Sequence, residues 1–143
     1  MNENSNRKSN FSVADVMSTE YLLLPGVATV AEALDKMKAA SAHSVLIDKR
    51  SDDDEYGIVL TSDIAKEVLA KNRSPERVNL YEIMTKPVLK VEPTMHIRYC
   101  ARMLEHFGIS TAPVVENGNI KGIVTYDVLV LKGLAGGELM GSE

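Results

Sequence analysis

Apolar and polar positions follow the same pattern twice along the chain. Each half contains one segment in which apolar residues recur at i, i+3, i+4 and i+7, the spacing of an amphipathic helix. These positions are Val30, Ala33, Leu34 and Met37 in the first half and Ile97, Cys100, Ala101 and Leu104 in the second. The second set follows the first at a constant offset of 67 residues. The pattern therefore indicates two copies of one structural unit.

Short apolar runs on both sides of these segments predict strands. One run precedes each helix and two follow it, the first of them continuous enough for a strand that is buried on both faces. The runs are 21–24, 45–47 and 57–59 in the first half, and 88–91, 112–115 and 120–124 in the second. A further helix is expected to close each half, over 62–71 and 127–134. Each half thus has the order β-α-β-β-α, which predicts an α/β protein of the α+β type.

Residues suited to helix caps stand at the expected ends of these elements. Ser12, Thr29 and Asn79 each lie three residues before a carboxylate, the arrangement of a capping box at the start of a helix. Gly108 follows the second amphipathic helix, where a left-handed residue costs least when it is glycine, and its counterpart in the first half is Ser41. These residues predict where the amphipathic helices and two short leading helices begin or end.

The turns between the last two strands differ between the halves. Asn117 and Gly118 predict a tight two-residue hairpin in the second half. The corresponding turn in the first half is the acidic stretch 51–55, which we interpret as a solvated hairpin tip, with a partner or cation site as the alternative.

The repeats predict one module with short flanking segments. Repeats of this kind seldom bury their apolar faces alone, so we expect the halves to pack sheet against sheet with a pseudo-two-fold relation and a cleft between them. The predicted segments are an N-terminal tail at 1–11, repeat 1 at 12–71, a linker at 72–78, repeat 2 at 79–134 and a C-terminal tail at 135–143.

The composition narrows the classes of function. The protein has a net charge of −4. It therefore lacks the positive surface potential that general binding to nucleic acid or to an anionic membrane requires. No apolar run approaches the roughly 18 residues of a membrane span, and residues 1–10 lack the apolar core of a secretory signal. The single cysteine, Cys100, excludes an intramolecular disulfide. These features favour the cytoplasm and predict neither nucleic acid nor a membrane as a partner.

No set of residues in the sequence predicts catalysis or metal binding. The three histidines lack the paired spacing and the neighbouring cysteines of a zinc site. Cys100 lies at an inward helix position, where cysteine usually acts as a small apolar residue rather than as a nucleophile. His96 and His106 are interpreted as solvated residues on the helix surface. We therefore expect no enzymatic activity, no metal and no required cofactor.

Two short motifs recur in both halves at corresponding places. They are Val16-Met17-Ser18 and Ile83-Met84-Thr85 at each start, and Gly57-Ile58-Val59 and Gly122-Ile123-Val124 ahead of Asp63 and Asp127. A third motif, Ile109 to Val115, stands in the second half. Over residues 12–134 the sequence resembles a free-standing pair of CBS domains, named after cystathionine β-synthase. The resemblance implies a Bateman-type regulatory module.

This resemblance also implies a class of ligand and an assembly. Such pairs bind AMP, ADP, ATP, NAD or S-adenosylmethionine in the clefts between repeats and often form flat homodimers. We expect an adenine nucleotide as the first candidate, a homodimer, and an unidentified protein that the module regulates. The alternative is a structural or dimerisation module whose clefts have degenerated and bind no ligand.

The family's ribose-binding motif is incomplete in both halves. In the family, the third strand ends in Gly, two apolar residues, Ser or Thr, two variable residues and Asp, and the hydroxyl and carboxylate bind the ribose. The first half keeps Asp63 at that distance but has Leu60 in place of the hydroxyl. The second half has Thr125, but its Asp127 comes one residue early. Either one helix start is shifted, so that Thr61 corresponds to Thr125, or one cleft has lost ribose recognition. A third interpretation is that these residues only cap the closing helices.

The resemblance places further residues at the ligand. His43 precedes the second strand of the first half, where family members often have a polar or basic residue that faces a phosphate; an exposed loop histidine is the alternative. The complete set of predicted ligand-binding residues is His43, Ser44, Thr61, Ser62, Asp63, Thr111, Ala112, Pro113, Thr125, Tyr126 and Asp127.

Overall fold

The structure is a computed structural model that describes residues 10–135. The chain divides into two compact units, which are considered separately below. Unit 1 comprises residues 1–20 and 89–143, and unit 2 comprises Tyr21–Val88. Most of the predicted N-terminal and C-terminal tails lies outside the described residues, and Ala135 ends the last helix.

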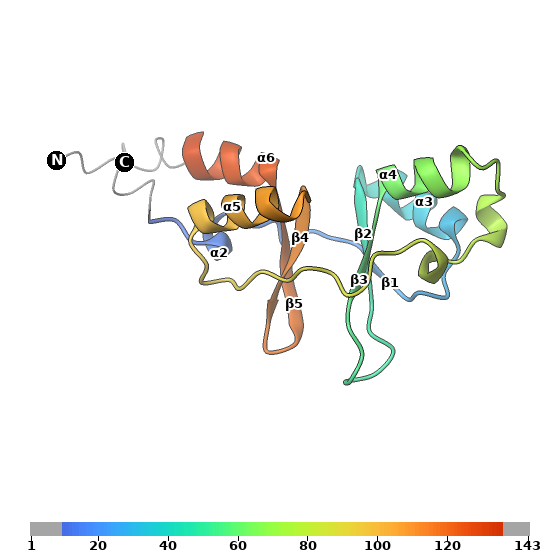
Figure 1. Ribbon diagram of the computed structural model, residues 1–143, viewed down its shortest axis with the longest axis horizontal. Coiled ribbons are helices and arrows are strands. Elements are labelled where there is room, and N and C mark those ends of the chain that lie inside the picture. The colour runs from blue at the N-terminus through green and yellow to red at the C-terminus, as the bar shows by residue number, and fades with distance from the viewer. Residues whose placement is uncertain (1–9, 136–143) are drawn as a thin grey trace. The chain divides into compact units, whose positions relative to one another are not determined.

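Unit 2 is a three-stranded sheet with helices packed on one face (Figure 1). The strand order is β1-β2-β3, with β1 parallel to β2 and β2 antiparallel to β3. Its elements are β1 (Leu23–Leu24), α3 (Val30–Ala40), β2 (Ser44–Ile47), β3 (Gly57–Leu60), α4 (Thr61–Ile64), the π-helical η1 (Ala65–Leu69), and the 3-10 turns η2 (Pro75–Arg77) and η3 (Leu80–Glu82).

Unit 1 repeats this plan with a sheet of two strands instead of three. Strands β4 and β5 form an antiparallel hairpin, and an isolated parallel bridge between Val91 and Val114 takes the place that β1 has in unit 2. Its elements are α2 (Val13–Val16), α5 (Ile97–Phe107), β4 (Thr111–Glu116), β5 (Asn119–Thr125), α6 (Tyr126–Val128) and the π-helical η4 (Leu129–Ala135). The mixture of helices and small sheets confirms the predicted fold class.

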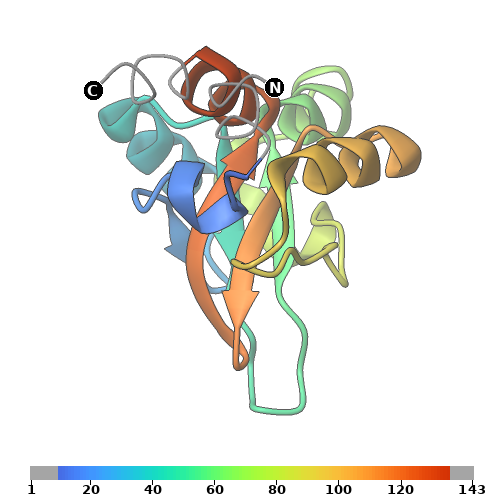
Figure 2. The ribbon, with the colours of Figure 1, turned by 90° about the vertical axis from the view of Figure 1, so that its left-hand side faces the viewer.

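Unit 1 holds most of repeat 2 and unit 2 holds most of repeat 1, but the two repeats exchange their first segments. The helix α2 begins the first repeat in sequence, yet it lies among the elements of unit 1 (Figure 1 and Figure 2). Its residues Val13 and Val16 are buried in the core of that unit. The turn η3 begins the second repeat, yet Leu80 is buried in the core of unit 2. Backbone hydrogen bonds hold both segments in the same way, from Val13 N–H to Met95 O at 2.8 Å and from Leu80 N–H to Ala28 O at 2.9 Å.

The recurring Met-Ser and Met-Thr motifs pack against a glycine in the last strand of each unit, Gly122 in β5 and Gly57 in β3. Ser18 and Ile123 exchange two backbone hydrogen bonds, as do Thr85 and Ile58. This crossing brings the chain so close that a Cβ added to Gly122 would lie 2.6 Å from Ser18 O. The glycine therefore recurs because the crossing segment leaves little room for a side chain beside it.

The predicted caps are present at the expected positions. The carboxylates three residues after Ser12, Thr29 and Asn79 accept hydrogen bonds from the N–H groups of those three residues at 2.8–2.9 Å. Ser41 and Gly108 both end their helices in the left-handed region, with φ of 53° and 65°. The capping interpretation is confirmed for both amphipathic helices and both leading segments.

His96 was expected on the solvated helix surface, but it is the N-cap of α5. Its Nδ1 accepts a hydrogen bond from Arg98 N–H at 3.0 Å, and His96 therefore stands where Thr29 caps α3. Desolvation, followed by the nearby Arg98 charge, lowers the pKa of His96. The prediction missed this role because histidine is not among the residues usually found as N-caps.

The two hairpin turns agree with the sequence, apart from one side chain. Asn117 and Gly118 both have positive φ, as the tight turn requires. Four of the five residues of the acidic stretch 51–55 are exposed, but Asp54 is turned inward. Its carboxylate accepts hydrogen bonds from the backbone N–H and the Nε–H of Arg50, at 2.9 and 3.2 Å, and lies 2.6 Å from Lys86 Nζ.

Candidate functional site

The predicted ligand-binding residues fall into two corresponding groups, one in each unit. In both units they stand where the second strand begins and the third strand passes into the closing helix. We call these groups the unit 2 edge and the unit 1 edge. The unit 2 edge consists of His43, Ser44, Thr61, Ser62 and Asp63. The unit 1 edge consists of Thr111, Ala112, Pro113, Thr125, Tyr126 and Asp127.

Strand register decides which residues of the two edges correspond. Ser44 pairs with Leu60 in unit 2, and Thr111 pairs with Thr125 in unit 1. Leu60 and Thr125 are both extended residues immediately before the first helical residue. Leu60 therefore corresponds to Thr125, and the helix starts are not shifted. The alternative in which Thr61 corresponds to Thr125 is wrong.

A complete capping box has a side-chain acceptor at the N-cap and a carboxylate three residues later. Each edge has only one of these two groups. Asp63, the third helical residue of α4, accepts a hydrogen bond from Leu60 N–H at 2.8 Å. In α6 the third helical residue is Val128, and its N–H donates to Thr125 Oγ1 at 3.3 Å. One edge has kept the carboxylate of the pair and the other has kept the hydroxyl. Both groups thus cap their helices, whether or not they also contact a ligand.

The predicted site residues differ in accessibility. His43, Thr61 and Ser62 are exposed, and the backbone carbonyl of His43 accepts a hydrogen bond from Thr61 N–H at 3.1 Å. Tyr126 and Asp127 are exposed at the unit 1 edge. Their role in ligand binding stays a prediction.

The apolar pair in the unit 1 edge is buried within its own unit. Ala112 belongs to the core of unit 1, and Pro113 is buried beside it. The carbonyl of Pro113 accepts a hydrogen bond from Val91 N–H at 3.0 Å. These two residues support the second strand, and the polar neighbours Ser110 and Thr111 are the more accessible part of that strand's start.

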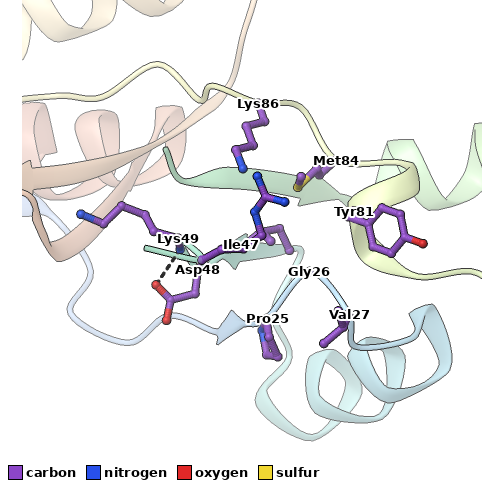
Figure 3. A pocket seen from close by; sticks show the side chains of 10 residues that line it. Pro25, Gly26, Val27, Ile47, Asp48, Lys49, Tyr81, Met84 and Lys86 are labelled. Atoms are coloured by element: carbon purple, nitrogen blue, oxygen red, sulfur yellow. Dashed lines mark hydrogen bonds between the residues drawn. The ribbon is translucent and has the colours of Figure 1, made fainter. Parts of the chain in front are cut away.

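A pocket in unit 2 was not predicted from the sequence. It has a volume of about 570 Å³ and lies at the end of β2 opposite the unit 2 edge. Figure 3 shows the loop with Pro25 and Val27 on one side and the segment with Met84 and Lys86 on the other. The pocket is lined by Pro25, Gly26, Val27, Ile47, Asp48, Lys49, Arg50, Tyr81, Met84 and Lys86. Three separate segments contribute to it, so no contiguous sequence motif could have revealed it.

Asp54 arranges two of the basic residues at this pocket. The hydrogen bond from Lys86, followed by the backbone N–H groups of Arg50 and Glu55, lowers the pKa of Asp54 far below its usual value. Asp54 is therefore ionised throughout the neutral range. Its Oδ1 binds Lys86 and its Oδ2 binds Arg50, so one carboxylate holds the two basic side chains next to each other.

Cys100 is expected to be unreactive in the folded protein. Its side chain is fully buried in the core of unit 1, and burial raises the pKa of the thiol to about 11. Because the thiolate is the reactive form, labelling by a disulfide reagent such as DTNB at pH 8 should be very slow in the native state and complete in denaturant. Rapid native labelling would contradict the position of α5 in the core.

The described part of the chain contains no cluster of three or more metal-binding side chains. Within residues 10–135, no helix has the length and apolar character needed to cross a membrane.

Comparison with known proteins gives a consistent result across the chain. Residues 13–70 and 80–131 each match the CBS domain family. An uncharacterized protein of Methanopyrus kandleri, MK0525, is 30% identical over 115 residues, which cover 80% of this chain and 58% of that protein. Homoserine O-acetyltransferase of Methanosalsum zhilinae is 30% identical over 122 residues, 83% of this chain but 23% of the enzyme. The chain thus spans 23% to 58% of the length of these two curated relatives.

Solved structures show the same fold. The hexameric CBS-CP12 protein from bloom-forming cyanobacteria is 31% identical with a TM-score of 0.83, covering 85% of this chain and 71% of that one. The CBS domain pair of protein MJ0100, in complex with 5′-methylthioadenosine and S-adenosyl-L-methionine, is 26% identical with a TM-score of 0.75, covering 90% and 98%.

The fold and the two corresponding edges define a protein built from a tandem pair of β-α-β-β-α repeats. The chain belongs to the CBS domain family, with two copies of the domain.

Proposed function

We propose that this protein is a regulatory module that senses an adenosine-containing ligand. AMP, ADP or ATP are the first candidates, and NAD and S-adenosylmethionine belong to the same class. Binding shifts the population of conformations and so alters a partner protein, provided that the ligand has different affinities for the two states.

The observation that carries this proposal is the polar character of both edges. Each places a hydroxyl and a carboxylate within three residues at the end of the third strand, with Ser62 and Asp63 in unit 2 and Thr125 and Asp127 in unit 1. A carboxylate accepts hydrogen bonds from the two hydroxyls of a ribose. The CBS pair of MJ0100, which binds two adenosyl compounds, supports the same class of ligand.

The unit 1 edge is the better candidate for ribose recognition. Among the described residues Asp127 has no hydrogen-bond or ion-pair partner, whereas Asp63 already accepts a hydrogen bond from Leu60 N–H. A ligand at Asp127 thus meets a carboxylate that is exposed and not already committed to a cap. A ligand at Asp63 has to share it with the backbone of Leu60.

A thermal-shift panel tests the proposal with AMP, ADP, ATP, NAD, S-adenosylmethionine and 5′-methylthioadenosine. A ligand at one hundred times its dissociation constant adds about 2.7 kcal/mol to the free energy of unfolding. We expect at least one member of the panel to raise the midpoint of unfolding. If no ligand does so at millimolar concentration, the sensor is ruled out and the structural or dimerisation module is favoured.

Variants locate the ligand that the panel identifies. Asp127→Ala is expected to weaken binding without loss of stability, because Asp127 caps nothing in the described structure. Asp63→Ala is expected to cost about 0.5–2 kcal/mol of stability through the lost cap, whatever its effect on binding. Asp53→Ala removes an exposed carboxylate from the hairpin tip and is the matched control. Equal affinity in all three variants would show that neither edge carboxylate binds the ligand, and would leave Asp63 as a cap only.

A further inference from the structure

The pocket of unit 2 has no role in the proposed sensing of an adenosyl ligand, because it lies at the other end of β2. Ser44, at the unit 2 edge, pairs with Leu60 at the start of β2, whereas Ile47 lines the pocket at the end of that strand. The pocket therefore requires its own explanation.

Its lining combines an apolar wall with basic side chains. The apolar part comes from Val27, Ile47 and Met84, and the exposed ring of Tyr81 stands at one side. The basic part consists of Lys49 and Arg50, which follow β2, and Lys86, which follows η3. A volume of about 570 Å³ is within the range of sites for small molecules.

The basic side chains are held in place. The side chain of Lys86 is only 22% exposed, and its Nζ lies 2.6 Å from Asp54 Oδ1. Lys49 Nζ lies 5.1 Å from the centre of the Tyr56 ring. Figure 3 shows the Lys86 side chain directed from its segment toward the strand end at Ile47. Counting Asp48 and Asp54 against the three cations leaves an excess of one positive charge, in a protein whose net charge is −4.

Unit 1 provides an internal comparison, because its backbone has the same arrangement at the place that corresponds to the pocket of unit 2. Tyr81 N–H donates to Gly26 O at 3.0 Å in unit 2, and Ala14 N–H donates to Pro93 O at 2.9 Å in unit 1. The bridges of Thr85 with Ile58 and of Ser18 with Ile123 correspond in the same way.

The three basic residues of the pocket have no basic counterpart in unit 1. By this register Lys86 corresponds to Thr19, and the parallel pairs Leu24–Ile47 and Val91–Val114 make Lys49 and Arg50 correspond to Glu116 and Asn117. At the three corresponding positions unit 1 thus has no lysine or arginine, and one of them, Glu116, is a carboxylate. The shared fold does not require the basic residues, since the same backbone forms without them.

We propose that the unit 2 pocket binds a small organic anion, in which one phosphate or carboxylate group is attached to a flat apolar ring. The ring lies against the apolar wall, and the anionic group meets Lys86 and Arg50 at the rim. Charge-assisted hydrogen bonds from these side chains orient the anion. The site is distinct from the two edges, so it gives the module a second input.

Phenyl phosphate is a probe of this class, and a titration followed by ¹H–¹⁵N NMR of the full chain tests the proposal. We expect saturable shifts at the amides of Gly26, Val27 and Lys49, and none at the unit 2 edge. Inorganic phosphate and benzyl alcohol, which carry only one of the two features each, should bind much more weakly. Shifts confined to either edge, or no saturable shift at millimolar concentration, would overturn the proposal.

Variants of the basic residues provide the second part of the test. Lys86→Gln and Arg50→Gln are each expected to weaken binding of phenyl phosphate about tenfold, as the loss of a charge-assisted hydrogen bond predicts. The Arg50 side chain is 85% exposed, so its variant carries little risk to folding. Lys121→Gln, on the exposed surface of β5, removes the same charge in unit 1 and should leave the affinity unchanged. Equal weakening by Lys121→Gln would show that only the overall charge matters and would refute the site.

The outcomes of the two ligand experiments are independent. A panel ligand that shifts the amides of His43, Thr61 or Asp127 supports the adenosyl sensor and says nothing of the pocket. Phenyl phosphate shifts at Gly26 and Val27 support the pocket even if every member of the adenosyl panel fails to bind.

Discussion

Gly122→Ala is expected to destabilise the protein by roughly 1–3 kcal/mol or more, the usual cost of forcing an extra carbon into a filled space. An added Cβ would lie 2.6 Å from Ser18 O and 2.8 Å from Met17 Sδ. The thioether can move, but the carbonyl is held by the two hydrogen bonds that Ser18 exchanges with Ile123. The strand crossing has to open for alanine to fit. Chemical denaturation followed by circular dichroism measures the loss.

The sign of this effect is diagnostic. Where no clash exists, replacing glycine by alanine stabilises a protein by about 0.4–1 kcal/mol, because the unfolded chain loses freedom. Gly57→Ala is the matched variant in unit 2, where the nearest atoms are Met84 Sδ at 2.9 Å and Thr85 O at 3.2 Å. Since the closer atom there belongs to a flexible side chain, Gly57→Ala should cost less than Gly122→Ala. A neutral or stabilising Gly122→Ala would contradict the close crossing.

The repeat architecture was predictable because it depends on local periodicity. Capping residues such as Thr29, the left-handed position of Gly108 and the Asn117–Gly118 turn each act within a few residues, so their sequence signals are sufficient. The same reasoning explains why His96 was misinterpreted, since a histidine cap has no strong sequence signal.

The exchange of first segments was not predictable in this way. Periodicity shows that the segment beginning at Asn79 is the start of a repeat, but not which core its apolar residues enter. The linker that precedes it allows either arrangement. Only the backbone bonds from Leu80 to Ala28 and from Val13 to Met95 determine the exchange.

The candidate sites also differ in how far the sequence could predict them. The ribose motif was recognisable because Gly57 and Asp63 are close in sequence, but the choice between a shifted helix and a divided capping box required the strand register. The pocket depends on Lys86 meeting Arg50 through Asp54, three residues from two distant segments. No sequence pattern encodes that meeting.

Leu80→Ala is expected to lower the free energy of unfolding by about 2–5 kcal/mol, the range for truncating a buried leucine. Leu80 is 0% exposed and packs in the core of unit 2, whose buried residues include Ala28, 52 positions earlier in the sequence. The truncation leaves a cavity that the surrounding sheet and helices fill only in part. Leu69→Ala makes the same change at a side chain that is 78% exposed, and should alter stability by less than about 0.5 kcal/mol.

Native-state hydrogen exchange shows which unit loses stability, and this tests the exchange of segments directly. Leu80→Ala should accelerate exchange of the amides in β2 and β3 more than of those in β4 and β5, although Leu80 belongs to the second repeat in sequence. Val13→Ala should have the reciprocal effect, because Val13 is buried in the core of unit 1. If each substitution instead loosened the strands of its own repeat, the segments would not be exchanged. The paired measurement separates a general loss of stability from a local one, since each variant serves as the control for the other.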